Sequence, residues 1–180
     1  MSSIQFYPDA SELDAQIQQQ MAVIFVQNFT AAPRYEEWTH QTALDYLQSL
    51  WNKGAQTWVF SSNHTVSDNI ILGFAIGIVI NEVTQSHDSK LLTDYPDAFY
   101  LEEIAVSLST QGQGIGKQLM HNTLTDIQQL SYPSYVTRVR SDIPAMIQLL
   151  QKSGFTQVDS YLASKGGVSF QRLIYQYSFS

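Results

Sequence analysis

The amino-acid sequence predicts an α/β fold in a single domain spanning residues 1–180. Segments whose apolar residues recur at every second position, as in strands, alternate with segments of helical period, in the order β-α-α-β-β-β-α-β-α-β-β. The 180 residues are 44% hydrophobic, which is enough for one buried core. No repeat, low-complexity block or linker interrupts this pattern, so one domain is the expectation.

The first half of the chain predicts a strand, two helices and two further strands. Residues 3–7 alternate apolar and polar side chains, and Asp9 or Ser11 can cap a helix that continues to about residue 29. A second helix is expected over residues 35–51, because apolar residues recur at helical spacing before Gly54. Strands are expected over residues 56–61 and 70–79, and Gly73 and Gly77 permit a bulge or the close approach of a ligand.

The second half predicts strands and helices in alternation, after a polar segment at residues 81–94 that is either a loop or partly helical. A strand over residues 100–106 leads through a glycine-rich turn into a helix. The remaining elements are a strand over residues 135–140, a helix over residues 142–153, and strands over residues 155–160 and 170–179.

The glycine-rich turn, Gln-Gly-Gln-Gly-Ile-Gly-Lys at residues 111–117, is the most informative motif in the chain. Glycines ahead of a helix let successive backbone N–H groups converge on one point, where the positive end of the helix dipole adds to them. Such a point suits a phosphate group. A dinucleotide fingerprint that starts at Gly112 would need glycine at position 117, which is Lys. A Walker A loop would need Ser or Thr at position 118, which is Gln.

What remains is Gln-x-x-Gly-x-Gly directly after the strand that ends in Ile-Ala-Val. This arrangement resembles the pyrophosphate-binding signature of the GNAT superfamily, the acyl-CoA-dependent N-acyltransferases, and the order of predicted elements is also similar to that fold. The resemblance implies a GNAT-like acyl-CoA N-acyltransferase fold, α/β, with a central mixed, mostly antiparallel sheet flanked by helices. It also implies acetyl-CoA as cosubstrate and an acetyl group transferred to a primary amine.

The resemblance implies that the cosubstrate is contacted by the end of the strand and by the loop. Lys117 could pair with a phosphate, and Asp142, which can cap the helix over residues 142–153, could add polar contacts. A backbone N–H near residues 104–106 would meet the oxyanion. The implied cosubstrate-binding residues are Ile104, Ala105, Val106, Gln111, Gly112, Gln113, Gly114, Ile115, Gly116, Lys117 and Asp142.

Glu102 and Glu103 are the candidate catalytic carboxylates. An amine attacks a thioester only when neutral, so the site must remove or exclude a proton, and a carboxylate that acts directly or through water can do this. Alternation along the strand points the two side chains to opposite faces, so at most one is expected to face the acceptor. Similarity to family members favours Glu102, and the alternative is that either one is a surface carboxylate. Because the chain has no cysteine, we expect direct attack in a ternary complex.

Two positions depart from the family pattern. Ile143 stands where many members have Asn, and Leu150 stands where many have the Tyr that protonates the leaving thiolate. Leu150 is expected to be a core residue, and Tyr161 is our candidate for the general acid instead. These departures leave a non-catalytic acyl-CoA sensor or structural module as the alternative function.

Composition narrows the remaining partners. The net charge of −7 and the scattered Lys and Arg residues argue against nucleic acid. The longest apolar runs are too short to span a bilayer, so a cytoplasmic protein without membrane contact is expected. The histidine spacing predicts no metal site. The identity of the acceptor, a small-molecule or protein amine, stays open, and Tyr35 or Trp38 could touch it. Residues 174–179 could form an edge strand that pairs in a homodimer.

Overall fold

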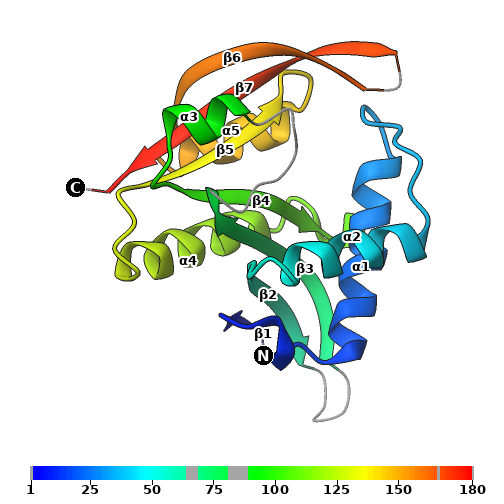
Figure 1. Ribbon diagram of the computed structural model, residues 1–180. Helices are drawn as coiled ribbons and strands as arrows, with labels where there is room; N and C mark the ends of the chain where they lie inside the picture. Colours follow the sequence, from blue (N-terminus) through cyan, green and yellow to red (C-terminus); the bar gives the residue numbers. More distant parts are fainter. Residues whose placement is uncertain (1, 64–68, 81–88, 166, 180) are drawn as a thin grey trace. The chain divides into compact units, whose positions relative to one another are not determined.

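The computed structural model describes residues 2–63, 69–80, 89–165 and 167–179. The chain divides into two compact units, Met1–Ile78 with Glu102–Thr123 and Val79–Leu101 with Leu124–Ser180. Seven strands follow the order β1-β2-β3-β4-β5-β7-β6 in one sheet. The β4–β5 pair is parallel, whereas β1–β2, β2–β3, β5–β7 and β6–β7 are antiparallel. The predicted α/β fold with a mixed, mostly antiparallel sheet is therefore confirmed (Figure 1).

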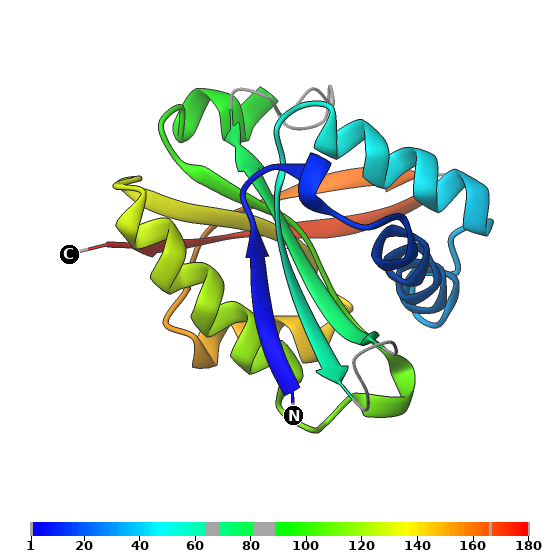
Figure 2. The same cartoon turned by 90° about the horizontal axis from the view of Figure 1, so that it is seen from below.

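The first unit contains the strands β1 (Ser2–Tyr7), β2 (Gln56–Asn63) and most of β3 (Asn69–Val79). The helices α1 (Ala15–Thr30) and α2 (His40–Trp51) lie side by side, as Figure 2 shows in blue and cyan. The unit also holds the second half of β4 (Phe99–Val106) and the beginning of α4 (Ile115–Gln129). Its core contains Met21, Phe25, Leu47, Trp58, Phe74 and Ile76, each without exposed surface.

Both helices of the first unit begin later than the sequence predicted. Asp9 caps only a 3₁₀ turn at Ala10–Glu12, and the carboxylate of Asp14 caps α1 by accepting from the backbone N–H of Gln16 at 2.6 Å. Helix α2 begins at residue 40, not 35, because Thr39 and Thr42 form a reciprocal capping box there. Residues 35–39 therefore lie outside α2, in the segment that joins the two helices.

Gly73 takes part in a close approach between segments of the chain itself. The register between β2 and β3 shifts beside it, so the predicted bulge is present. A Cβ at this position would lie 3.0 Å from the carbonyl oxygen of Ala105 on β4 and 3.2 Å from side-chain atoms of Ile115 and Leu119 on α4. Glycine thus lets β4 and the start of α4 pack directly against β3.

The second unit contains the beginning of β4, with β5 (Ser134–Arg140), β6 (Thr156–Lys165) and β7 (Val168–Ser178). Its helices are α3 (Ser89–Asp94), α5 (Pro144–Lys152) and the end of α4. The polar segment expected at residues 81–94 is thus helical from residue 89, and residues 81–88 lie outside the described residues. Strand β7 lies between β5 and β6, so residues 174–178 are not the sheet edge that the sequence suggested. The strand order ends with β6 after β7, so β6 is the edge strand at that end of the sheet.

Candidate functional site

The glycine-rich loop has the geometry that its sequence predicted. Gly112 and Gly114 have φ angles of +80° and +84°, in the left-handed region that favours glycine. Helix α4 then begins at Ile115, and the backbone N–H of Gln118 donates to the carbonyl of Gly114 at 3.0 Å. The first N–H groups of a helix have no partner within the helix itself. The turn therefore opens onto backbone donors at the positive end of the helix dipole, which suit a phosphate group.

Two side-chain amides hold this loop to the end of β4. The Nδ2 group of Asn28 on α1 donates to the carbonyl of Val106 at 3.0 Å and to that of Ile24 at 2.8 Å. The Nε2 group of Gln111 donates to Oδ1 of Asn28 at 3.1 Å and to the same Val106 carbonyl at 3.3 Å. Gln111 thus positions the loop through contacts within the protein. Sequence reasoning missed Asn28, although an amide between the apolar residues of a helix was a possible signal.

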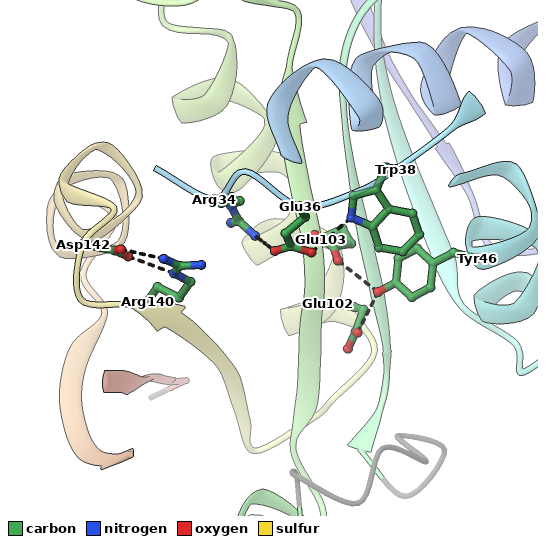
Figure 3. A network of polar contacts seen from close by, with 8 residues as sticks. All are labelled: Arg34, Glu36, Trp38, Tyr46, Glu102, Glu103, Arg140 and Asp142. Atoms are coloured by element: carbon green, nitrogen blue, oxygen red, sulfur yellow. Dashed lines mark hydrogen bonds and ion pairs between the residues drawn. The ribbon is translucent and has the colours of Figure 1, made fainter. Parts of the chain in front are cut away.

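The two candidate carboxylates meet at one hydroxyl group. Oε1 of Glu102 and Oε1 of Glu103 each lie 2.9 Å from the phenolic oxygen of Tyr46 on α2 (Figure 3). The two carboxylates therefore reach the same hydroxyl, although strand alternation predicted that they point to opposite faces. Strand alternation fixes only the direction of each Cβ, and the longer glutamate side chain can turn beyond it. Sequence reasoning did not identify Tyr46, because it is distant in sequence and reads as an ordinary helix residue.

Aromatic rings and a third carboxylate surround this pair within the first unit. The Tyr46 ring lies 5.4 Å from that of Phe25 and 5.5 Å from that of Trp38, centroid to centroid. The indole Nε1 of Trp38 donates to Glu36 at 3.1 Å (Figure 3). Of the two aromatic residues considered for acceptor contact, Trp38 belongs to this cluster, whereas the Tyr35 side chain is 74% exposed.

Arg34, which lies in the segment between α1 and α2, adds a positive charge to this cluster. Its guanidinium lies 4.0 Å from the Phe29 ring centroid, and Nη1 lies 4.0 Å from a carboxylate oxygen of Glu36. The side chains of Arg34 and Glu36 are 22% and 12% exposed, so their charges are only partly screened by water.

Burial and like charge change the acidity of this cluster. Enclosure by protein, followed by the negative charge of Glu102, raises the pKa of Glu103 to about 8, and the charge of Arg34 opposes this rise. Burial, followed by the charge of Glu103, holds the pKa of Tyr46 well above its usual range. The Tyr46 hydroxyl therefore keeps its proton at neutral pH and can donate it in a hydrogen bond. A carboxyl with a pKa near the working pH suits a general base.

The predicted site residues of the second unit make contacts of their own. Asp142 does not cap α5, because Ile143 occupies the cap position without a side-chain bond. Its carboxylate instead accepts from Nε and Nη2 of Arg140 at 2.9 and 2.6 Å (Figure 3). The hydroxyl of Tyr161 on β6 accepts from Arg138 at 3.5 Å, and no contact described for it tests the general-acid role. Leu150 has no exposed surface, which agrees with a core residue.

The remaining predicted positions are distributed along β4 and the loop. Ile104, Ala105 and Val106 end β4, and Ala105 and Ile115 are buried. Gly116 lies in the first turn of α4, while Gln113 and Lys117 are exposed. Among the described residues, no group of three or more His, Asp or Glu side chains could hold a metal ion. Within the same residues, no helix is both long and apolar enough to cross a membrane.

Comparisons with known proteins agree with this geometry. A family model described as the acetyltransferase (GNAT) family matches residues 23–155. The search of curated proteins finds no match.

Similar solved structures cover nearly the whole chain at low sequence identity. An N-acetyltransferase from Staphylococcus aureus Mu50 is 17% identical, with 99% of this chain and 98% of that chain covered and a TM-score of 0.68. The ribosomal-protein-S18-alanine N-acetyltransferase from Escherichia coli is 18% identical, with 100% and 95% covered and a TM-score of 0.67. The protein yncA from Salmonella typhimurium, solved with its cofactor acetyl-CoA, is 17% identical, with 98% and 93% covered and a TM-score of 0.65. These structures share the fold, and the match to the family model shows that the chain belongs to the GNAT family of acetyltransferases.

Proposed function

We propose that this protein is an acetyl-CoA-dependent N-acetyltransferase that acts on a primary amine, with residues 1–180 as one catalytic domain. The observation that supports the proposal most is that a single strand, β4, carries the candidate base and anchors the candidate phosphate loop at its end. Its Glu102 and Glu103 lie against the Tyr46 hydroxyl. Four residues after Glu102, the Val106 carbonyl anchors the glycine-rich loop through Asn28 and Gln111. Base and phosphate loop are thus connected by a few residues of one extended segment.

In this proposal the backbone N–H groups of residues 112–117 bind the pyrophosphate of acetyl-CoA. Gly112 and Gly114 support this, because their φ angles turn the chain toward the start of α4. The exposed Lys117 adds a positive charge near the phosphates. The end of β4, at residues 104–106, supplies a backbone N–H for the oxyanion, and Asp142 remains a proposed polar contact.

The proposed reaction is direct attack without a covalent enzyme intermediate. The acceptor enters as an ammonium ion, and Glu102 or Glu103 takes the proton that must leave before its nitrogen can attack. The new C–N bond forms as the C–S bond breaks, and the departing thiolate takes a proton from a general acid, for which Tyr161 stays the proposed residue. The nitrogen then releases its second proton, which restores the general acid, so one proton leaves to water for each acetyl group transferred. The chain contains no cysteine that could carry the acyl group.

Charge and aromatic surface support a cationic acceptor. Three carboxylates, Glu36, Glu102 and Glu103, lie near the rings of Trp38 and Tyr46. Carboxylates attract an ammonium ion, and aromatic faces attract cations further. A small-molecule amine and a protein amine, such as the ribosomal-protein-S18 alanine named for one structural neighbour, both fit. The cytoplasmic location and a homodimer also remain proposals.

Thiol release from acetyl-CoA in the presence of a panel of amines tests this proposal. Exchange of Glu102 and Glu103 together for Gln should lower kcat/KM by about 10²–10⁴, the usual contribution of a general base. Glu37→Gln is the matched control, since Glu37 is an exposed glutamate of the neighbouring segment. An unchanged rate in the double variant, over the whole pH range, would exclude the carboxylate base.

The alternative is a domain that binds acyl-CoA without turnover, as a sensor or structural module. The buried Leu150 motivates it, because the general acid of many family members is missing at that position. Thermal unfolding with acetyl-CoA, CoA, NAD and ATP separates the two functions when combined with the amine panel. A ligand at about 100 times its Kd adds about 2.7 kcal/mol to the unfolding free energy. Stabilisation by acetyl-CoA without thiol release from any amine would favour the sensor, whereas thiol release excludes it.

A further inference from the structure

The Tyr46 hydroxyl contacts two carboxyl groups, but its single hydrogen can be donated to only one of them. Its oxygen lies 2.9 Å from a carboxyl oxygen of Glu102 and 2.9 Å from one of Glu103. A hydroxyl group has one hydrogen to donate and lone pairs with which to accept, and an ionised carboxylate can only accept. If both glutamates were ionised, one of these short contacts would bring two acceptor oxygens together without a proton between them. A proton on one carboxyl removes this conflict, because a protonated carboxyl can donate to the phenolic oxygen.

We infer that Glu102, Tyr46 and Glu103 form one unit in which the two carboxyl groups share a single proton across the Tyr46 hydroxyl, which makes Tyr46 the positioning residue of the base. The protonated glutamate donates to Tyr46, and Tyr46 donates to the ionised one. The role of this unit in catalysis rests on the proposed function, whereas the number of protons that the unit holds does not.

The charged groups around this unit agree with one retained proton. From the segment between α1 and α2, Glu36 adds a negative charge that opposes ionisation, and Arg34 adds a positive charge that favours it. These two are paired with each other at 4.0 Å, so their effects partly cancel. Burial and the charge of Glu102 remain, and both raise the pKa of Glu103, to about 8.

The shared proton has a consequence for the acceptor. With one proton, the pair carries a single negative charge, which matches the single positive charge of one ammonium group. The ionised member can take a proton from that ammonium, after which the pair is neutral and the amine can attack. Loss of one proton to water restores the starting state, so charges and protons balance over the cycle.

The free protein, without substrate, allows a direct test by NMR titration of ¹³C-labelled glutamate side chains. In the wild-type protein we expect the pair to ionise in two separate steps, with the upper step near pH 8. Tyr46→Phe keeps the ring beside Phe25 and Trp38 but removes the bridge that stabilises the singly protonated pair. The two steps should therefore move toward each other, by about one pH unit or more. Tyr35→Phe, which removes an exposed hydroxyl, should leave both steps unchanged.

Other outcomes would overturn the inference. If Tyr46 only donates to the carboxylates, Tyr46→Phe would move both ionisation steps to higher pH together. In the wild-type protein, two ionisation steps below about pH 5 would show that no proton is shared. Glu102→Gln gives a second test if Tyr46→Phe does not fold, because the step near pH 8 should then fall, and an unchanged step would contradict sharing. The absence of thiol release with every amine would remove the proposed function, yet it would leave these titrations as they are.

Discussion

Replacement of Gly114 by Ala tests the phosphate loop at a position where the backbone conformation favours glycine. Gly114 has a φ angle of +84°, and a Cβ added there would meet nothing within 4 Å. The variant therefore suffers no steric clash, and its cost is the backbone strain of a left-handed alanine, about 1–2 kcal/mol. Part of that strain can be relieved if the loop rotates, which would turn the backbone N–H groups away from the phosphates.

Gly54 provides a control with matched strain. It follows α2, has a φ angle of +83° and likewise has nothing within 4 Å of an added Cβ. Both variants should thus lower the unfolding free energy by about the same amount, which corresponds to a Tm decrease of about 2–8 °C for a chain of this size. Only Gly114→Ala should weaken acetyl-CoA binding, by about tenfold or more, since one lost hydrogen bond to a charged group is worth about 1.5–3 kcal/mol.

Isothermal titration calorimetry with acetyl-CoA, together with thermal unfolding of the free proteins, measures both effects. Equal acetyl-CoA affinity in the wild-type protein and in a folded Gly114→Ala variant would refute the assignment of the loop. So would a loss of affinity in Gly54→Ala of the same size, because the effect would then follow general destabilisation.

Three further predictions test the neighbouring structure. Glu103 ionises near pH 8 in the folded protein and near 4.5 when unfolded, so the folded state holds the extra proton between these values. Stability should therefore fall as the pH rises from about 5 to 8, by at most about 1.4 kcal/mol per pH unit, and urea unfolding of Glu103→Gln should show a flatter dependence. Asn28→Ala should cost about 1–3 kcal/mol, and Gln111→Ala, which removes exposed hydrogen bonds, should cost about 0.5–1.5 kcal/mol. Their double variant should cost less than the sum, because the two amides share partners, and strict additivity in urea unfolding would argue against the contact. Gly73→Ala should lower stability by about 1–3 kcal/mol, because its Cβ would lie 3.0 Å from the Ala105 carbonyl oxygen, and a Tm equal to that of the wild-type protein would contradict this packing.

Much of the fold follows from local patterns in the sequence. The periods of apolar residues identified the main strands and helices, and the glycine loop was recognised from its spacing alone. Helix beginnings were less predictable, because several residues near each one can cap a helix. Asp14 and not Asp9 caps α1, and Thr39 caps α2, which begins at residue 40 and not near Tyr35. Several residues near a helix start could serve as its N-cap, and the one that does so depends on where the helix packs. A local sequence pattern does not contain that information.

The candidate site shows the same division. Sequence alone predicted Glu102, Glu103 and the residues of the loop, because strand, motif and chemistry coincide over a short stretch. It did not predict Asn28 or Tyr46, which lie 78 residues from Val106 and 56 residues from Glu102. A contact over such a separation has no periodic signature, because it exists only once helices and strands pack together.

The sequence by itself determined the family, the α/β order of elements and the glycines that turn the loop, because each depends on residues that are neighbours in the chain. Only the tertiary structure decided that both glutamates meet at one hydroxyl, that Gln111 binds within the protein, and that β7 is an inner strand. Side-chain alternation is a rule for Cβ directions, whereas the position of a charged group depends on which element packs against the strand. The acidity of the pair, and with it the proposed base, therefore depends on packing between segments that are distant in the sequence.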